Sequence, residues 1–180
     1  TGVLEKEPTR STLSWAKHKL QMVTGVARAM AYLHGQEPPV IHRDMKPDNV
    51  LIDDGWQAKV ADLGCSREMD LEKTMELAGT PIFMAPELLR RERYDEKVDV
   101  WSFACLLECM WTHAVVYEGI NDGRDSSGFV VRRDVVKEVE NETLKPKAGG
   151  FLAGLVASCA EYDPEERCAF GWVVEELTAL

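Results

Sequence analysis

The chain has 180 residues, of which 45% are hydrophobic and 29% are charged, a balance typical of one globular domain and not of a disordered or fibrous chain. Its formal net charge of −10 excludes a protein that binds nucleic acid through the phosphate backbone, because such binding needs a positive surface. An acidic surface leaves room for a basic peptide partner, although a generally solvated surface is the simpler interpretation.

The cysteines and the apolar stretches indicate where the protein resides. The five cysteines are odd in number and show no C-x-x-C metal spacing, which favours a reducing, intracellular and most simply cytoplasmic compartment. No secretory signal is visible, and the most apolar stretch, residues 103–117, is too short to span a bilayer. The chain begins with Thr1 and not with Met, which suggests a piece of a longer protein.

The first predicted element is a helix of about six turns that ends near Gly35. Ser11 and Thr12 are its candidate caps. Its apolar stripe recurs at three- and four-residue steps and consists of Ala16, Leu20, Val23, Ala27, Met30 and Leu33.

A small β patch and a series of shorter helices follow. Short strands are predicted at 40–41, 50–52 and 58–60, and Asp53-Asp54-Gly55 signals a hairpin turn between the last two. Residues 64–85 show neither helical nor alternating periodicity, and a loop of that length in a domain is usually functional. The further predicted helices lie at about 86–91, 98–112, 130–141, 149–160 and 165–179, the last entered through Asp163-Pro164. The predicted fold class is α+β, predominantly helical, with one small β patch.

The residues of chemical interest lie in and beside this β patch. Residues 41–52 read IHRDMKPDNVLI, and residues 59–64 read KVADLG. Phosphoryl transfer needs a group that orients the attacking hydroxyl, oxygen ligands for magnesium and positive charge near the transferred phosphate. The two segments hold all three kinds of group.

Four residues are candidates for that chemistry. Asp44 is suited to accept the hydroxyl proton, and Lys46 is suited to stabilise charge on the γ-phosphate. Asn49 and Asp62 offer oxygen ligands for Mg²⁺ and leave positions for phosphates and water. A hairpin between Asn49 and Asp62 would return both to the same edge of the β patch.

These segments and two later ones resemble the protein kinase family. HRDMKPDN resembles the catalytic loop and KVADLG the magnesium-binding motif that opens the activation segment. GTPIFMAPE at 79–87 resembles the end of that segment, and VDVWSFACLLE at 98–108 resembles the buried central helix. The resemblance covers essentially the whole chain and implies the C-terminal lobe of a protein kinase-like fold, with the N-terminal lobe absent. The implied partial domain, 1–180, contains helices in 1–34, a catalytic loop at 41–52, an activation segment at 62–87 and a helical remainder at 88–180.

The resemblance implies a role for each catalytic residue. Asp44 is similar to the catalytic base, and Lys46 is similar to the phosphate-contacting lysine. Asn49 belongs to the same catalytic set, and Thr80 resembles the threonine that hydrogen-bonds Asp44 and Lys46. Lys46 together with Gly79-Thr80 is the serine/threonine-specific pattern, so the implied partner is a protein with a Ser or Thr acceptor hydroxyl.

The implied cofactors are ATP and Mg²⁺. Lys46, Asn49 and Asp62 would contact the nucleotide phosphates or the metal, with Asn49 and Asp62 as metal ligands. Leu51 matches the residue that forms the floor beneath adenine. The sequence GTPIFMAPE most resembles the corresponding segment of the tyrosine-kinase-like group of serine/threonine kinases.

Three scaffolding roles are also implied. Asp99 resembles the buried carboxylate that accepts backbone N–H bonds from the catalytic loop, and Glu87 with Arg167 resembles a buried ion pair. His42 is expected to pack under Leu63, which replaces the phenylalanine of most relatives. We interpret Leu63 as a tolerated packing change. The alternative is that it alters how readily the motif changes between its active and inactive arrangements. His42 as a zinc ligand is disfavoured, because no second ligand has zinc spacing.

The sequence does not decide which residue supplies the negative charge that orders the activation loop. Arg43 is the hallmark of kinases whose loop is ordered by a phosphate, because arginine pairs well with a dianion. Glu76 occupies the place where many relatives have a phosphoacceptor, and it is either a permanent negative charge for Arg43 or simply solvated. Thr74 and Ser66 are the alternative phosphoacceptors.

No glycine-rich phosphate loop and no V-A-I-K-like lysine precede residue 41. We therefore expect the chain alone to bind Mg-ATP poorly and to show little kinase activity. The alternative function is a non-catalytic kinase lobe that serves as a docking module. A small-molecule phosphotransferase of the same fold is disfavoured by Arg43 and by Ala85-Pro86-Glu87.

Overall fold

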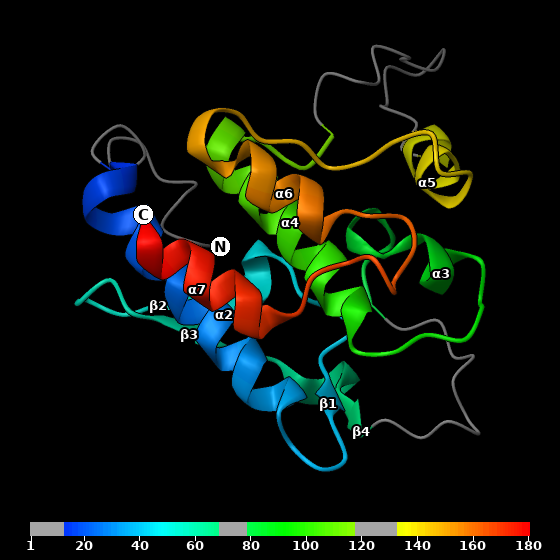
Figure 1. Cartoon of the computed structure of the whole chain (residues 1–180), viewed down its shortest axis with the longest axis horizontal. Helices are drawn as coiled ribbons and strands as arrows, with labels where there is room; N and C mark the ends of the chain where they lie inside the picture. The colour runs from blue at the N-terminus through cyan, green and yellow to red at the C-terminus, as the bar shows by residue number, and fades with distance from the viewer. Residues whose placement is uncertain (1–12, 69–78, 118–132) are drawn as a thin grey trace.

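The computed structural model describes residues 13–68, 79–117 and 133–180 (Figure 1). The predicted caps Ser11 and Thr12 and the loop residues Thr74 and Glu76 lie outside these ranges. The helices are α2 (Leu20–His34), α3 (Pro86–Leu89), α4 (Lys97–Thr112), α5 (Arg133–Glu140), α6 (Ala153–Cys159) and α7 (Phe170–Ala179), and the strands are β1 (Val40–Ile41), β2 (Val50–Ile52), β3 (Ala58–Val60) and β4 (Arg67–Glu68). The prediction of a mostly helical α+β domain with a small β patch is confirmed.

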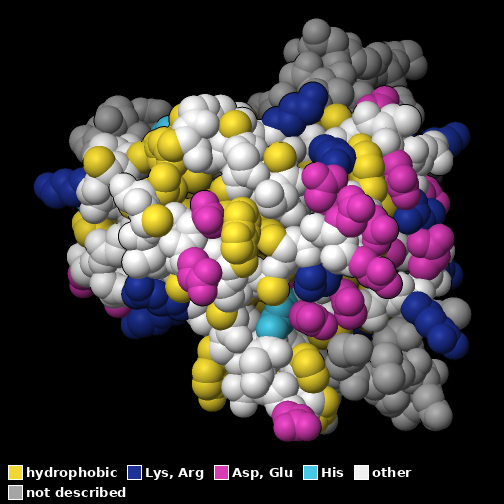
Figure 2. All heavy atoms as spheres, viewed as in Figure 1, with side chains coloured by type: hydrophobic (Ala, Val, Ile, Leu, Met, Phe, Trp, Pro, Cys, Tyr) yellow, Lys and Arg dark blue, Asp and Glu magenta, His cyan; other side chains and the backbone are white. Residues whose placement is uncertain are grey.

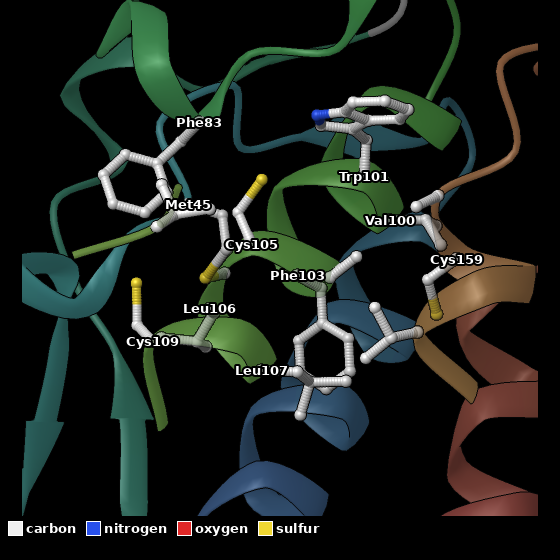
Figure 3. Packing of buried hydrophobic residues seen from close by; sticks show 14 of the residues in the cluster. Met45, Phe83, Val100, Trp101, Phe103, Cys105, Leu106, Leu107, Cys109 and Cys159 are labelled. Atoms are coloured by element: carbon white, nitrogen blue, oxygen red, sulfur yellow. The ribbon is translucent and has the colours of Figure 1, made fainter. Parts of the chain in front are cut away.

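Helix α4 is the centre of the core. Every residue from 98 to 110 is buried, so the helix is covered all round and needs no polar face. Helix α6 packs along it, and Figure 3 shows side chains of α4 meeting Met45 of the segment between β1 and β2. Ser102 Oγ donates a hydrogen bond to the carbonyl of Phe83 at 2.7 Å. The helix therefore ties together segments that are far apart in the sequence.

Helix α2 covers a second side of the domain, where it packs against α7 and β3 (Figure 1). The helix ends at Gly35 as predicted. The predicted apolar stripe is confirmed in part: its buried members are Val23, Ala27 and Met30, and Met22 and Val26 are buried beside them. Leu20 and Leu33 are only partly buried, and Ala16 is exposed. A π-helical turn, Trp15–Lys19, precedes it and is capped by Ser14, whose hydroxyl accepts a hydrogen bond from Lys17 N. Within the described residues the cap is thus Ser14.

The strands form two separate antiparallel pairs. β2 pairs with β3 in the register Val50↔Val60, which confirms the predicted hairpin. Asp53 Oδ1 shapes the turn by accepting hydrogen bonds from the backbone N–H groups of Gly55 and Gln57, each at 3.0 Å. β1 pairs with β4 in a second sheet that the sequence did not predict, and this pair joins the start of the activation segment to the strand before the catalytic loop.

Three predicted helix boundaries are wrong. The last helix begins at Phe170 and not at 165, because Arg167 is held in a turn by its backbone bond to Asp163 and by its side-chain bond to Glu87. The predicted helix 149–160 divides into a 3₁₀ turn at 150–152 and α6, and Gly150 has a φ of 56°. Helix α3 ends at Leu89 and not at 91, where Arg91 has a φ of 57°.

The surface in Figure 2 carries many acidic side chains around α3, in agreement with the formal charge of −10. Basic side chains are interspersed among them (Figure 2). Among the residues that the structure describes, no helix combines the length and the apolar character needed to cross a membrane.

Candidate active site

The segment between β1 and β2 is held in place by a buried carboxylate of α4. Asp99 Oδ2 accepts a hydrogen bond from His42 N, and Oδ1 accepts one from Arg43 N, both at 2.8 Å. His34 Nε2 lies 2.9 Å from Asp99 Oδ2, and Asp99 is fully buried. The predicted bonds from Asp99 to the backbone of this loop are confirmed, whereas the contact from His34 had no signal in the sequence.

Asp44 is the centre of a polar cluster. Its Oδ2 lies 2.8 Å from Lys46 Nζ, and its Oδ1 accepts hydrogen bonds from Thr80 N and Thr80 Oγ1, each at 2.8 Å. Lys46 Nζ also donates to Thr80 Oγ1 at 2.7 Å. Asn49 Nδ2 donates to Asp44 Oδ2 at 3.0 Å and to the Asp44 carbonyl at 2.7 Å. The structure therefore brings together four of the predicted site residues, and the predicted bonds of Thr80 are confirmed.

These contacts determine the charge of Asp44. Burial raises the pKa of its carboxyl, but hydrogen bonds from Lys46, Thr80 and Asn49 and the charge of Lys46 lower it by more. The net pKa lies below the ordinary value of 3.8. Asp44 is thus an ionised hydrogen-bond acceptor at neutral pH.

Asp62 reaches the same edge through the β2–β3 hairpin. The backbone N–H of Ala61 donates to the carbonyl of Asn49 at 2.9 Å, so Asp62 is one residue beyond this link. Asp62 has φ 59° and ψ 69°, and its Oδ1 accepts a hydrogen bond from Gly64 N at 3.2 Å. Its side chain is exposed and makes no direct contact with Asp44 or Asn49 among those that the structure records for the described residues.

The donor set fits magnesium better than a softer metal. Asn49 uses its amide N–H groups on Asp44, which leaves the amide oxygen for another partner, and Asp62 offers its second carboxylate oxygen. Such hard oxygen ligands with positions left for phosphate and water suit Mg²⁺. In the described part of the chain no three His, Cys, Asp or Glu side chains group as metal ligands, so a metal here would have few protein ligands.

Leu51 and Leu63 are large hydrophobic residues that are exposed to solvent. Leu51 of β2 is 58% exposed, so it is open to a ligand. Leu63 is 52% exposed, so it adds little to the core, whereas His42 is fully buried and its Nε2 lies 3.1 Å from the carbonyl of Ala61. The expected packing of His42 under Leu63 stays a prediction.

Gly79 has a steric role that sequence reasoning missed. Its φ is +110°, and a Cβ at this position would lie 2.3 Å from the carbonyl oxygen of Arg43 and 3.3 Å from Asp44 Oδ1. Only glycine adopts this conformation without strain and allows such a close approach. A loop glycine before Thr80 was visible in the sequence, but its contact with the catalytic loop was not.

Arg43 is held by groups that the sequence did not single out. Its Nε donates to the carbonyl of Cys65 at 2.6 Å, and its Nη1 donates to Tyr94 Oη at 3.4 Å. Arg43 is buried and has a φ of 67°. The hydroxyl of Ser66 is buried as well, so a modifying enzyme would reach it only after this segment moves.

The predicted ion pair between Glu87 and Arg167 is confirmed. Arg167 Nη1 lies 2.7 Å from Glu87 Oε1, and Nη2 lies 3.3 Å from Oε2. Arg167 also donates to the carbonyls of Glu161, Lys97 and Tyr162. This pair fixes the end of the activation segment against the turn before α7.

Comparisons with known proteins agree with this geometry. The family model described as "Protein kinase domain" matches residues 3–177. The chain is 45% identical over 169 residues to "Probable serine/threonine-protein kinase drkB" of Dictyostelium discoideum, which covers 93% of this chain and 23% of that protein. It is 33% identical over 173 residues to "Probable serine/threonine-protein kinase drkC" of the same organism, with 94% and 22% covered.

The similarity extends to a plant protein. The chain is 32% identical over 182 residues to "Serine/threonine-protein kinase CTR1" of Arabidopsis thaliana, which covers 99% of this chain and 21% of that protein. This match supports the predicted place near the tyrosine-kinase-like group. The chain spans between a fifth and a quarter of the length of these three relatives. By its family match and by its similarity to these kinases, the chain belongs to the protein kinase family, on the serine/threonine side.

Proposed function

We propose that this chain is the catalytic lobe of a protein serine/threonine kinase that transfers the γ-phosphate of ATP to a Ser or Thr hydroxyl of a protein substrate. Residues 1–180 would form the C-terminal lobe of the kinase domain. The observation that carries the proposal is the set of close contacts that Lys46, Asn49 and Thr80 make with the carboxylate of Asp44.

Asp44 would orient the acceptor hydroxyl. Because its pKa is lowered, the carboxylate is a weak base and would accept a hydrogen bond from the hydroxyl in the ground state. It would take the proton only when the attacking oxygen becomes acidic during transfer. Thr80 occupies Oδ1 of the carboxylate with two donors, which leaves Oδ2 as the oxygen shared by Lys46, Asn49 and the incoming hydroxyl.

Lys46 would stabilise the transferred phosphate. Its side chain is 20% exposed, so its ammonium group can contact a ligand while it stays bound to Asp44 and Thr80. A cation fixed beside the carboxylate places positive charge near the oxygens on which charge develops. The same contacts keep Lys46 from folding away from the site.

Asn49 and Asp62 would hold Mg²⁺ through their side-chain oxygens. When bound, the metal neutralises phosphate charge and helps to align the γ-phosphate. Leu51 would supply an apolar surface for the adenine ring, since its exposed side chain lies on β2 directly after Asn49 and Val50. The placement of these residues on one hairpin allows the nucleotide and the metal to be bound together.

The test measures transfer from radiolabelled ATP to a Ser- and Thr-containing protein such as casein. It compares the chain alone, the chain extended upstream in its own coding sequence, and the extended protein with Asp44→Asn. We expect phosphate on serine or threonine with the extended protein, little with the chain alone, and almost none with the variant. Transfer that survives Asp44→Asn would contradict the role proposed for this carboxylate, and no transfer by any form would favour the docking module. Turnover by the chain alone at the family's order of about 1–100 per second would contradict the expectation that it has little kinase activity by itself.

A further inference from the structure

Two cysteines that take no part in the site described above lie in contact with each other between α6 and α7. Cys159 is the last residue of α6, and Cys168 lies in the turn that leads into α7. Their Sγ atoms are 3.5 Å apart, and both residues are free thiols. The backbone fixes this approach, because Cys168 N donates to the carbonyl of Ser158 at 3.2 Å.

The two thiols differ in exposure. Cys159 is fully buried, where it forms part of the core against α4 (Figure 3), and Cys168 is partly exposed. A small solute can therefore reach the sulfur of Cys168 first. The buried sulfur of Cys159 lies behind it, at contact distance.

The two thiols also differ in acidity. The hydrogen bond from Cys159 lowers the pKa of Cys168 by more than burial raises it, and the positive charges of Lys97 and Arg167 lower it further. The same hydrogen bond, followed by burial, raises the pKa of Cys159 well above its ordinary value. Of the two thiols, that of Cys168 therefore ionises more readily, and Cys168 is also the partly exposed residue of the pair. A lowered pKa together with partial exposure is typical of a reactive cysteine.

We propose that Cys159 and Cys168 form an oxidation site at which a hydroperoxide converts the pair to a reversible disulfide. The thiolate of Cys168 attacks the OH oxygen of the hydroperoxide, so that an S–O bond forms and the O–O bond breaks. The departing alkoxide or hydroxide takes a proton from solvent, which replaces the one that the thiol lost on ionising, and Cys168 is left as a sulfenic acid. The sulfur of Cys159 then attacks the sulfur of Cys168. An S–S bond forms, the S–O bond breaks, and the hydroxide leaves as water with the proton of Cys159. The dithiol loses two electrons and the hydroperoxide gains them.

The geometry requires only a small movement. The sulfurs would close from 3.5 Å to the disulfide length of about 2.05 Å. The turn between α6 and α7 contains no regular helix or strand, so it can absorb that shift. The other cysteines do not combine these features, because Cys105 and Cys109 are buried with raised pKa values, and Cys65 has no thiol contact among the described residues.

The disulfide would enclose Arg167, the residue beside Cys168. Arg167 is the buried partner of Glu87, which lies at the end of the activation segment. Oxidation would thus tie the turn that carries Arg167 covalently to α6. This inference does not depend on the proposed transfer of phosphate, because it concerns a different part of the molecule.

The test treats the purified chain with hydrogen peroxide, blocks the remaining thiols with N-ethylmaleimide, and digests it with trypsin without reduction. Trypsin cleaves after Lys147 and after Arg167, so the two cysteines fall in the separate peptides 148–167 and 168–180. We expect mass spectrometry to show these two peptides joined, and to show them apart after treatment with dithiothreitol. Cys168 should be oxidised at least about tenfold faster than Cys65, the matched cysteine of similar exposure.

Two variants serve as controls. Cys168→Ser, at a partly exposed position, should abolish the joined peptides and leave Cys159 reduced. Cys159→Ser should leave Cys168 as a sulfenic acid that dimedone traps. The proposal is overturned if Cys168 and Cys65 oxidise equally fast, if the joined peptides increase with protein concentration, or if they form as fast in urea as in the folded chain.

Discussion

Two of the clusters in which a basic side chain meets a carboxylate differ in how many of their groups a ligand can still reach. Lys46 lies 2.8 Å from Asp44, and Arg167 lies 2.7 Å from Glu87, so the two ion pairs are equally close. Arg167 is fully buried and bonds three backbone carbonyls besides Glu87. Lys46 is 20% exposed, and its partners are the side chains of Asp44 and Thr80.

This difference separates a structural ion pair from a site that can bind a ligand. The pair of Arg167 and Glu87 has no solvent-facing group, so it can only contribute to folding. In the cluster of Asp44, the side chain of Lys46 is 20% exposed and that of Asp44 is 9% exposed, so a substrate can reach the cluster from solvent. We therefore expect substitutions in the pair of Arg167 and Glu87 to lower stability. Substitutions in the cluster of Asp44 should lower activity with little loss of stability.

The largest effect on stability is expected for Arg167→Ala. The variant leaves Glu87 buried without a cation, which typically costs about 3–5 kcal/mol in the free energy of unfolding. Urea denaturation measures the loss. The matched control is Arg90→Ala, because Arg90 pairs with the exposed carboxylates of Glu92 and Glu142, and we expect it to cost less than about 1 kcal/mol. Equal losses in the two variants would contradict the comparison.

A smaller loss is expected for Asp99→Asn, at the carboxylate that connects the two clusters through α4. Asparagine has one acceptor oxygen, so one of the N–H groups of His42 and Arg43 would face an amide N–H group. The loss of a charge-assisted bond at a buried site costs about 1.5–3 kcal/mol, and denaturation measures it. The control is Asp53→Asn, where an exposed carboxylate also accepts two backbone N–H bonds and water can replace them. A loss at Asp53 as large as that at Asp99 would mean that burial is not the cause.

The next effect in size is expected for Gly79→Ala, which acts on the contact between the activation segment and the catalytic loop. Alanine at a φ of +110° with its Cβ against the Arg43 carbonyl would cost about 1–3 kcal/mol or force the backbone apart. The strain favours arrangements in which Thr80 has moved away from Asp44, so the transfer rate of the extended protein should fall. Gly171→Ala is the control, because Gly171 lies in α7 with no atom within 4 Å of the new Cβ, and this variant should be slightly stabilised. An active, stable Gly79→Ala variant would contradict the steric argument.

The sequence predicted the parts of the fold that short-range patterns determine. The hairpin of β2 and β3 was predictable from Asp53-Asp54-Gly55, and α4 was predictable because its apolar run is long. The pairing of β1 with β4 was not, because two-residue strands carry no periodicity and their partners are distant in sequence. The start of α7 was misplaced because the side chain of Arg167 is bound to Glu87, a tertiary contact that outweighs local helix propensity.

For the site, the order and spacing of the motifs were sufficient to group Asp44, Lys46, Asn49 and Thr80. They were not sufficient to show how close the backbones approach at Gly79, because that distance depends on the packed structure. The roles of these residues in transfer stay predictions. So does the binding of a metal by Asp62, whose side chain makes no direct contact with Asn49 among the described residues.

The smallest effect on stability, and the largest on activity, is expected for Asp44→Asn. Asparagine has nearly the same volume and keeps an acceptor for Thr80, and the lost partner Lys46 is partly exposed, so the free energy of unfolding at pH 7 should change by less than about 1 kcal/mol. The transfer rate of the extended protein should fall about 10²- to 10⁴-fold, the usual contribution of a positioned base.

The pH dependence of stability tests the same substitution independently of activity. The pKa of Asp44 is lower in the folded chain than its ordinary value of 3.8, so its ionised form stabilises the fold above that value. This contribution is lost as the pH falls through the lowered folded pKa. Denaturation curves between pH 7 and pH 2 compare the free energies of unfolding of the unsubstituted chain and of Asp44→Asn. Any excess stability of the unsubstituted chain should shrink below pH 3.8, because the variant has no carboxylate to protonate at this position. If the difference in the free energy of unfolding between the two proteins grew on acidification, the hydrogen bonds from Lys46 and Thr80 would not stabilise the charged form of Asp44. The proposal that Asp44 is held as a carboxylate for catalysis would then lose its support.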